Sequence, residues 1–268
     1  MSNKSPKVYL LPNLMTAGNL FCGFMAILTI FAVMRNPELG PAYYYRAIGY
    51  ILGACAFDLL DGRLARIKGQ ESEFGREFDS IADIVSFGVA PAMLMMDMVL
   101  EDFGTQISQL IAFVYLLCGA MRLARFNVIA SSKASDGESS MEFTGFPIPA
   151  AAGVIASITL FLLWLQGGDK ELGHWRYALL VLMLLLSFLM FSEFEYPSFK
   201  LINWRTRRSL PWVFCAILVL VLTIQFWEIM PAVIFMGYLL YGFIRPWLSK
   251  KRRREIEIGD DEDFEDDD

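Results

Sequence analysis

The chain has 268 residues, of which 56% are hydrophobic and 14% aromatic, and its formal net charge at pH 7 is −6. This composition is more apolar than that of a typical soluble domain of the same length, and it excludes an ordinary globular enzyme of the aqueous phase. We therefore expect an all-α polytopic membrane protein, and we expect no nucleic acid among its partners.

Eight apolar windows are long enough to cross a bilayer, which needs roughly 20 mostly apolar residues per helix. In chain order they cover residues 14–34, 43–64, 78–100, 107–128, 147–166, 177–193, 210–226 and 230–248. Pro147 and Pro149 stand at the start of the fifth window, as expected for the first turn of a helix. The sequence therefore predicts about eight transmembrane helices.

The distribution of basic residues predicts how these helices are oriented. If both ends of the chain lie on one side of the membrane, 19 of the 23 Lys and Arg residues fall on that side. The positive-inside rule then places both termini in the cytoplasm.

The chain divides into three predicted parts. Residues 1–200 form a core of six spans, residues 201–249 add two transmembrane helices, and residues 250–268 form a tail that is first basic and then acidic. Ten of the 29 acidic residues lie in 255–268, a composition typical of a disordered, solvated segment. The basic run at 250–254 is expected to fix the topology, or to bind anionic headgroups of membrane lipids.

Two polar stripes lie at the end of the second window and the start of the third. On a helix, residues spaced i, i+3, i+4, i+7 and i+8 share one face. The first stripe follows this spacing and consists of Asp58, Asp61, Gly62, Ala65 and Arg66. The second consists of Gly75, Asp79 and Asp83. Because consecutive helices joined by a short turn are usually antiparallel neighbours, we expect the four aspartates to converge near one depth.

Four carboxylates at close range repel one another, and an ionised side chain inside a membrane costs roughly 2.5–3.5 kcal/mol. A cation must offset this cost, and carboxylate oxygens suit Mg2+, Mn2+ or Ca2+. Because Mg2+ usually binds substrate phosphates as well, the stripes predict phosphoryl-type chemistry with one or two metals. The alternative is a cluster of salt bridges between the aspartates and basic neighbours such as Arg63 and Arg76.

The complete pattern, Asp-x2-Asp-Gly-x2-Ala-Arg-x8-Gly-x3-Asp-x3-Asp, resembles the signature of the CDP-alcohol phosphotransferase family of membrane lipid enzymes. Four further segments resemble the bacterial phosphatidylserine synthase subgroup of that family. They are residues 11–16 (LPNLMT), 119–127 (GAMRLARFN), 143–149 (FTGFPIP) and 196–200 (YPSFK). The last two spans and the acidic tail lie outside this resemblance.

The resemblance implies transfer of a phosphatidyl group from CDP-diacylglycerol to the hydroxyl of L-serine, with release of CMP. It implies two divalent cations, Mg2+ or Mn2+, one held by Asp58, Asp61 and Asp79 and the other by Asp58, Asp79 and Asp83. Asp83 would also be the general base. The nucleotide pocket would be lined by Gly62, Ala65, Arg66 and Gly75, with Asn13, Thr16 and Ser72 as further candidates. A homodimer in the bacterial cytoplasmic membrane, with its active site on the cytoplasmic side, is also implied.

A separate set of polar residues is expected to recognise the acceptor. Zwitterionic serine needs a cation for its carboxylate and a hydrogen-bond acceptor for its ammonium group. The candidates for binding serine or phosphate are Arg122, Arg125, Asn127 and Lys200. Each of them could equally fix the topology or contact lipid headgroups. Glu193 and Glu195 could bind the ammonium group or pair with Lys200.

Two other functions fit parts of the sequence. The same chemistry with glycerol 3-phosphate or inositol phosphate as acceptor would need a denser basic pocket, which Arg122 and Arg125 could partly supply. A cation transporter would need acidic residues near the membrane midplane, with access from both faces. The four aspartates cluster towards one face instead, with Asp97 as a lone acid near the outer end of the third window. We therefore favour an enzyme.

Overall fold

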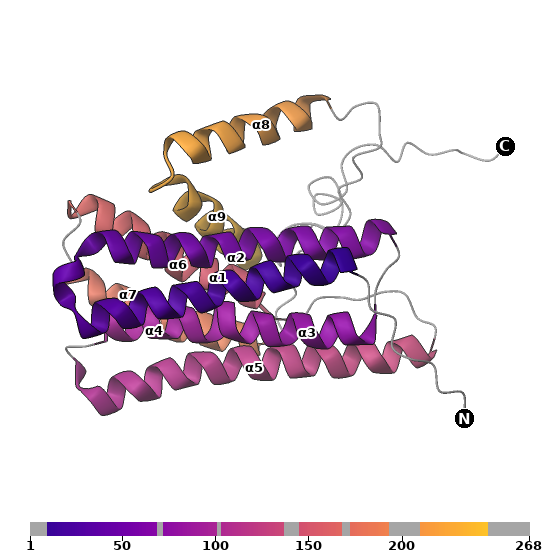
Figure 1. Ribbon diagram of the computed structural model, residues 1–268, viewed down its shortest axis with the longest axis horizontal. Coiled ribbons are helices and arrows are strands. Elements are labelled where there is room, and N and C mark those ends of the chain that lie inside the picture. The colour runs from indigo at the N-terminus through magenta and orange to yellow at the C-terminus, as the bar shows by residue number, and fades with distance from the viewer. Residues whose placement is uncertain are drawn as a thin grey trace.

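The computed structural model describes residues 10–68, 72–100, 103–136, 145–167, 172–192 and 210–245. Within these ranges the secondary structure is helical and contains no strand. Most of the long helices lie side by side and run along the longest axis of the molecule (Figure 1).

The bounds of the helices follow the predicted windows closely. The α-helices are α1 (Leu10–Arg35), α2 (Pro41–Lys68), α3 (Glu73–Asp83), α4 (Ala90–Met98), α5 (Thr105–Asp136), α6 (Ile148–Leu165), α7 (Trp175–Phe191), α8 (Leu210–Gln225) and α9 (Met230–Ile244). A short 3-10 helix, η1 (Pro37–Leu39), joins α1 to α2, and a π-helix, η2 (Ile84–Val89), joins α3 to α4. The third predicted window therefore corresponds to one continuous helical path that consists of three consecutive segments, α3, η2 and α4. α5 continues eight residues beyond the predicted end of the fourth window.

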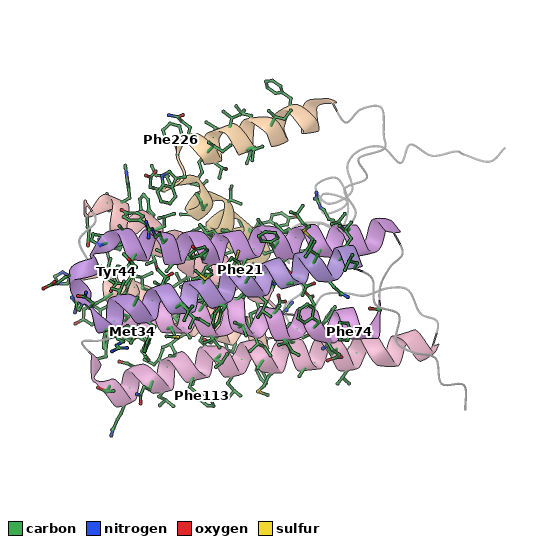
Figure 2. All side chains as sticks on the ribbon, in the orientation of Figure 1. Phe21, Met34, Tyr44, Phe74, Phe113 and Phe226 are labelled. Carbon is green, nitrogen blue, oxygen red and sulfur yellow. The ribbon has the colours of Figure 1, made fainter. Side chains whose placement is uncertain are left out.

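Four helical stretches are long and apolar enough to cross a membrane, namely Leu10–Arg35, Phe74–Met98, Thr105–Ile129 and Ile148–Leu165. α7 and α9 are apolar but shorter. Large apolar side chains also face outwards: Phe21 on α1 is 60% exposed and Phe113 on α5 is 55% exposed (Figure 2). In a membrane such surfaces contact lipid. The expectation of an all-helical polytopic membrane protein is confirmed, whereas the count of eight spans and the cytoplasmic location of both termini stay predictions.

One buried face of α1 holds the bundle together at its centre. Its members recur every three or four residues, the spacing of one helix face, and α1 packs along α2 as well as along α3 and η2. The buried residues are Pro12, Thr16, Asn19, Cys22, Gly23, Ala26, Ile30 and Val33. The face is polar in its first half and apolar beyond it, so that α1 brings hydrogen-bonding groups to only one end of the bundle.

A proline explains why the π-helix η2 occurs where it does. Pro91 has no N–H group, and its ring clashes with the carbonyl four residues earlier, which belongs to Phe87. The Tyr115 hydroxyl of α5 donates a hydrogen bond of 3.0 Å to that Phe87 carbonyl instead. π-Helical turns are rare in proteins, but those that occur are often found at functional sites. Here the turn begins directly after Asp83.

The outer end of the same helical path holds Asp97, the acid that the sequence left without a role. Asp97 is buried in α4 and accepts a hydrogen bond from the hydroxyl of Tyr44, which is buried in α2. Buried polar groups are stable when they are hydrogen-bonded in this way. Asp97 therefore ties α2 to α4 far from the other aspartates.

The predicted start of the fifth window is confirmed. Pro147 caps α6, and Pro149 lies in its first turn. α6 is the most buried of the four candidate spans, and it packs against α2, α7 and α9. α8 lies apart from the bundle, beyond α9 (Figure 1). Residues 255–268, for which we predicted a disordered tail, lie outside the described residues.

Candidate functional site

Three of the four aspartates meet at one point between α2 and α3. Carboxylate oxygens of Asp58, Asp61 and Asp79 lie within 4.8 Å of one another. Asp61 is buried and the other two are half-buried. One oxygen of Asp79, Oδ1, is buried without a hydrogen-bond partner. Three hard oxygen donors, one of them unsatisfied, fit a divalent cation such as Mg2+ or Mn2+. The predicted convergence of the two stripes is confirmed for these three residues.

Thr16 supports this cluster from the neighbouring helix α1. Its hydroxyl lies 3.1 Å from Oδ2 of Asp61 and 3.2 Å from the Pro12 carbonyl of its own helix, in reach of a hydrogen bond to each. A threonine hydroxyl has one hydrogen to donate, and the carboxylate is the acceptor that carries charge. In the structure Thr16 contacts Asp61, and its predicted contact with the nucleotide stays a prediction.

Asp83 lies beside the three clustered aspartates without joining them. It is buried, and it is close enough to Asp58 and Asp79 for their charges to interact. The side-chain amide of Asn19 donates a hydrogen bond of 3.1 Å to Oδ1 of Asp83. The backbone carbonyl of Asn19 in turn accepts a hydrogen bond of 2.9 Å from the hydroxyl of Ser86 in η2. A metal site that includes Asp83 stays a prediction.

The sequence analysis missed Asn19. The residue is fully buried, and its own Oδ1 has no hydrogen-bond partner. The sequence feature that could have identified Asn19 is a polar side chain inside an apolar span. It lies three residues after Thr16 and thus on the same face of the helix. Intramembrane polar groups of this kind are costly and often functional.

The candidate nucleotide residues Asn13, Ser72 and Gly75 lie together at the start of α3. Ser72 caps α3, because its hydroxyl accepts a hydrogen bond of 3.0 Å from the Gly75 N–H. A Cβ atom on Gly75 would lie 3.3 Å from Oδ1 of Asn13, so the glycine leaves room for that side chain. Nδ2 of Asn13 is buried and unpartnered. Gly62 is half-buried in α2, and the side chains of Ala65 and Arg66 lie outside the described residues.

The candidate acceptor residues divide into three groups. Arg122 on α5 is 7% exposed, and its Nε atom has no hydrogen-bond partner. Arg125 donates hydrogen bonds to the Phe191 and Ser192 carbonyls at the end of α7, over 3.4 and 3.3 Å.

Asn127 donates a hydrogen bond of 2.9 Å to the hydroxyl of Ser80 in α3. Arg125 and Asn127 therefore join helices in this structure, whereas Arg122 is buried with an Nε atom that has no hydrogen-bond partner. Lys200, Glu193 and Glu195 lie outside the described residues.

Comparison with known proteins shows to which family the chain belongs. The family model of CDP-alcohol phosphatidyltransferases matches residues 9–191, which include both aspartate stripes. The chain belongs to this family. Among members of the family, a CDP-diacylglycerol--serine O-phosphatidyltransferase of Helicobacter pylori is 35% identical over 245 residues, which are 90% of this chain and 92% of the relative.

Two further members of the CDP-alcohol phosphatidyltransferase family come from distant organisms. A protein of Bacillus subtilis with the same name is 33% identical over 192 residues, 71% of this chain and 91% of the relative. An archaetidylserine synthase of Methanothermobacter thermautotrophicus is 35% identical over 189 residues, 70% of this chain and 69% of the relative. Because the Helicobacter match covers 90% of the chain, it extends beyond residue 191 into the last two helices, which the sequence analysis had left unmatched.

Proposed function

We propose that this protein transfers the phosphatidyl group of CDP-diacylglycerol to the hydroxyl of L-serine, giving phosphatidylserine and CMP. The observation that carries this proposal is the 35% identity to a CDP-diacylglycerol--serine O-phosphatidyltransferase over 92% of that relative's length. The three clustered aspartates support it, because a pyrophosphate donor needs a divalent cation to offset its charge.

The donor would bind at the end of the bundle where the aspartates lie. A divalent cation held by Asp58, Asp61 and Asp79, Mg2+ or Mn2+, would neutralise the pyrophosphate oxygens and stabilise CMP as it leaves. The family resemblance suggests a second cation held by Asp58, Asp79 and Asp83. Gly75 leaves space beside Asn13, whose unpartnered amide would donate to the nucleotide. Gly62, Ala65, Arg66 and Ser72 complete the proposed nucleotide pocket.

Asp83 would act as the general base. The serine oxygen forms a bond to the phosphorus that carries the diacylglycerol, while the bond from this phosphorus to the CMP oxygen breaks. The serine hydroxyl proton passes to the Asp83 carboxylate, which the Asn19 amide holds in place. Arg122, with its buried and unused Nε, is the proposed partner of the serine carboxylate. Arg125, Asn127 and Lys200 remain weaker candidates for contacts to the acceptor.

The site would face the cytoplasm of a bacterial cell, where serine is available. The excess of Lys and Arg on the predicted cytoplasmic side supports this orientation. We also propose a homodimer in the cytoplasmic membrane, as the family resemblance suggests.

A panel of acceptors tests the proposed function. Purified protein in detergent micelles receives CDP-diacylglycerol, Mn2+ or Mg2+, and one alcohol at a time from L-serine, glycerol 3-phosphate and inositol phosphate, and CMP release is measured. We expect CMP release that depends on serine and on the metal, and that EDTA abolishes. Release with glycerol 3-phosphate but not with serine would overturn the assignment of the acceptor.

A further inference from the structure

The side-chain oxygen of Asn19, Oδ1, is a buried acceptor that the proposed mechanism does not use. Asn19 lies on the polar half of the buried face of α1 and has no exposed surface. Among the described residues its Oδ1 atom has no hydrogen-bond partner. A buried carbonyl oxygen has lost its hydrogen bonds to water, and it is costly unless another group supplies a donor. Oδ1 of Asn19 is therefore a candidate contact for a bound substrate.

The other end of the same amide determines where this oxygen lies. Nδ2 of Asn19 donates a hydrogen bond of 3.1 Å to Oδ1 of Asp83. An ionised carboxylate accepts hydrogen bonds but cannot donate them, so the NH2 end of the amide must face Asp83. Because the nitrogen and oxygen of a planar amide are only about 2.2 Å apart, Oδ1 of Asn19 lies no more than about 5.3 Å from Oδ1 of Asp83.

The backbone of Asn19 is also held in place. The hydroxyl of Ser86, which is fully buried in η2, donates a hydrogen bond of 2.9 Å to the Asn19 carbonyl. Asn19 is thus fixed through its main chain by η2 and through its side chain by Asp83. Its unpaired oxygen therefore has a defined place beside the proposed general base.

L-Serine carries the kind of donor that this oxygen lacks. Its ammonium and hydroxyl groups are bound to adjacent carbon atoms, so that the nitrogen and the oxygen are about 3 Å apart in a staggered conformation. A serine whose hydroxyl contacts Asp83 can therefore place its ammonium group within reach of an acceptor next to that carboxylate. The bond from an ammonium group is charge-assisted, and an amide oxygen accepts it without adding another negative charge to the four aspartates.

We propose that Oδ1 of Asn19 accepts a hydrogen bond from the ammonium group of the acceptor, and that Asn19 thereby selects a 1,2-amino alcohol over other alcohols. This inference rests on the proposed function. The two ends of the amide then have separate roles, because Nδ2 orients Asp83 and Oδ1 recognises the substrate. Loss of the first role lowers kcat, whereas loss of the second raises the KM for serine.

A substrate analogue separates these two roles in the full-length protein. 3-Hydroxypropionate is serine without its amino group, and it is assayed as a competitor of serine in CMP release with saturating CDP-diacylglycerol and Mn2+. We expect Asn19→Ala to raise the KM for L-serine about five- to tenfold. The inhibition constant of 3-hydroxypropionate and the KM for CDP-diacylglycerol should each change less than twofold, because neither compound has an ammonium group.

A second variant and a control test the same oxygen without truncating the side chain. Asn19→Asp has the same shape and retains an acceptor oxygen in either protonation state, but it lacks the NH2 group. Its KM for serine should stay within about twofold of the wild-type value while kcat falls. Thr29→Val is the control on the same helix, since the Thr29 hydroxyl donates to the Met25 carbonyl over 2.6 Å. It should leave kcat and all three affinities unchanged.

The outcomes distinguish this inference from the proposed function. If the wild type shows serine-dependent CMP release but Asn19→Ala lowers kcat at an unchanged KM for serine, the ammonium contact is wrong and the function stands. An equal weakening of serine and 3-hydroxypropionate would also overturn the contact, because the effect would not depend on the amino group. If the wild type uses another 1,2-amino alcohol instead of serine, the function is wrong, and a selective rise in the KM for that acceptor would still support Asn19.

Discussion

The Asn19 side-chain amide donates a hydrogen bond of 3.1 Å to Oδ1 of Asp83, and so joins the first helix to the last aspartate of the motif. A second bond, of 2.9 Å from Ser86 to the Asn19 carbonyl, fixes the backbone at the same point. With Oδ1 occupied in this way, the orientation of the Asp83 carboxylate is defined, as a general base requires. The proposed base is therefore oriented by a helix that carries none of the four aspartates.

Replacing Asn19 by alanine should slow turnover without abolishing metal binding. A hydrogen bond to a charged group contributes about 1.5–3 kcal/mol, so kcat for serine-dependent CMP release should fall roughly 10- to 100-fold. Mn2+ affinity, measured by electron paramagnetic resonance of the free ion, should change little, because Asp58, Asp61 and Asp79 are untouched. A normal kcat in Asn19→Ala would show that Asp83 does not depend on this amide.

Thr16 should contribute to metal affinity through Asp61. Thr16→Val has nearly the same shape and lacks the hydroxyl that reaches Oδ2 of Asp61 over 3.1 Å. Loss of a group that orients a metal ligand typically costs 10- to 100-fold in affinity or activity, and we expect the Mn2+ concentration for half-maximal activity to rise by such a factor.

Thr29→Val is the matched control for Thr16→Val. Its hydroxyl lies in the same helix and donates only to the Met25 carbonyl, over 2.6 Å. The Mn2+ dependence of this control should equal that of the wild type. Equal metal dependence in Thr16→Val and Thr29→Val would contradict the role of Thr16.

The convergence of Asp58, Asp61 and Asp79 could be predicted from the sequence because it depends on two simple periodicities. Residues three or four apart share a helix face, and a short turn makes consecutive helices antiparallel neighbours. Asn19 could not be found in this way. It lies about 40 residues before the motif on a different helix, and only the packing of α1 against α3 and η2 brings it to Asp83.

The π-helix that interrupts the third window also could not be predicted from the periodicity of the apolar residues. A run of apolar residues predicts a helix whether its turns are of the α or the π type, so the hydrophobic pattern offered no reason to place η2 after Asp83. Pro91 was the available signal, since proline disturbs a helix one turn before its own position. The tertiary part of the explanation, the hydrogen bond from Tyr115 to the Phe87 carbonyl, depends on α5 and is visible only in the fold.

The close approach of α1 to η2 makes Gly23 a critical residue for stability. A Cβ atom on Gly23 would lie 2.2 Å from Oγ and 2.6 Å from Cα of Ser86, and backbone atoms cannot move aside cheaply. Gly23→Ala should therefore destabilise the protein by about 1–3 kcal/mol, seen as a lower Tm in detergent. It should also lower activity, because Ser86 is displaced from Asn19.

Gly49→Ala controls for the general effect of adding a methyl group to a helical glycine. A Cβ atom on Gly49 meets nothing within 4 Å, and alanine is the better helix former by up to about 1 kcal/mol. Its Tm should equal or exceed that of the wild type. If both variants behave alike, the contact between Gly23 and Ser86 does not limit stability.

Asp83→Asn is the decisive test of the general base. The amide has the size of the carboxylate but cannot accept the serine proton, so serine-dependent CMP release should fall roughly a hundredfold or more. Tm and Mn2+ binding to the site formed by Asp58, Asp61 and Asp79 should stay close to those of the wild type, because these three aspartates remain. Asp97→Asn is the matched control, since Asp97 is also buried in the same helical path but accepts its hydrogen bond from Tyr44, far from the cluster. An asparagine can still accept that hydrogen bond, so Asp97→Asn should retain turnover. Comparable losses of serine-dependent CMP release in the two variants would show that Asp83 matters for the fold and not for proton transfer.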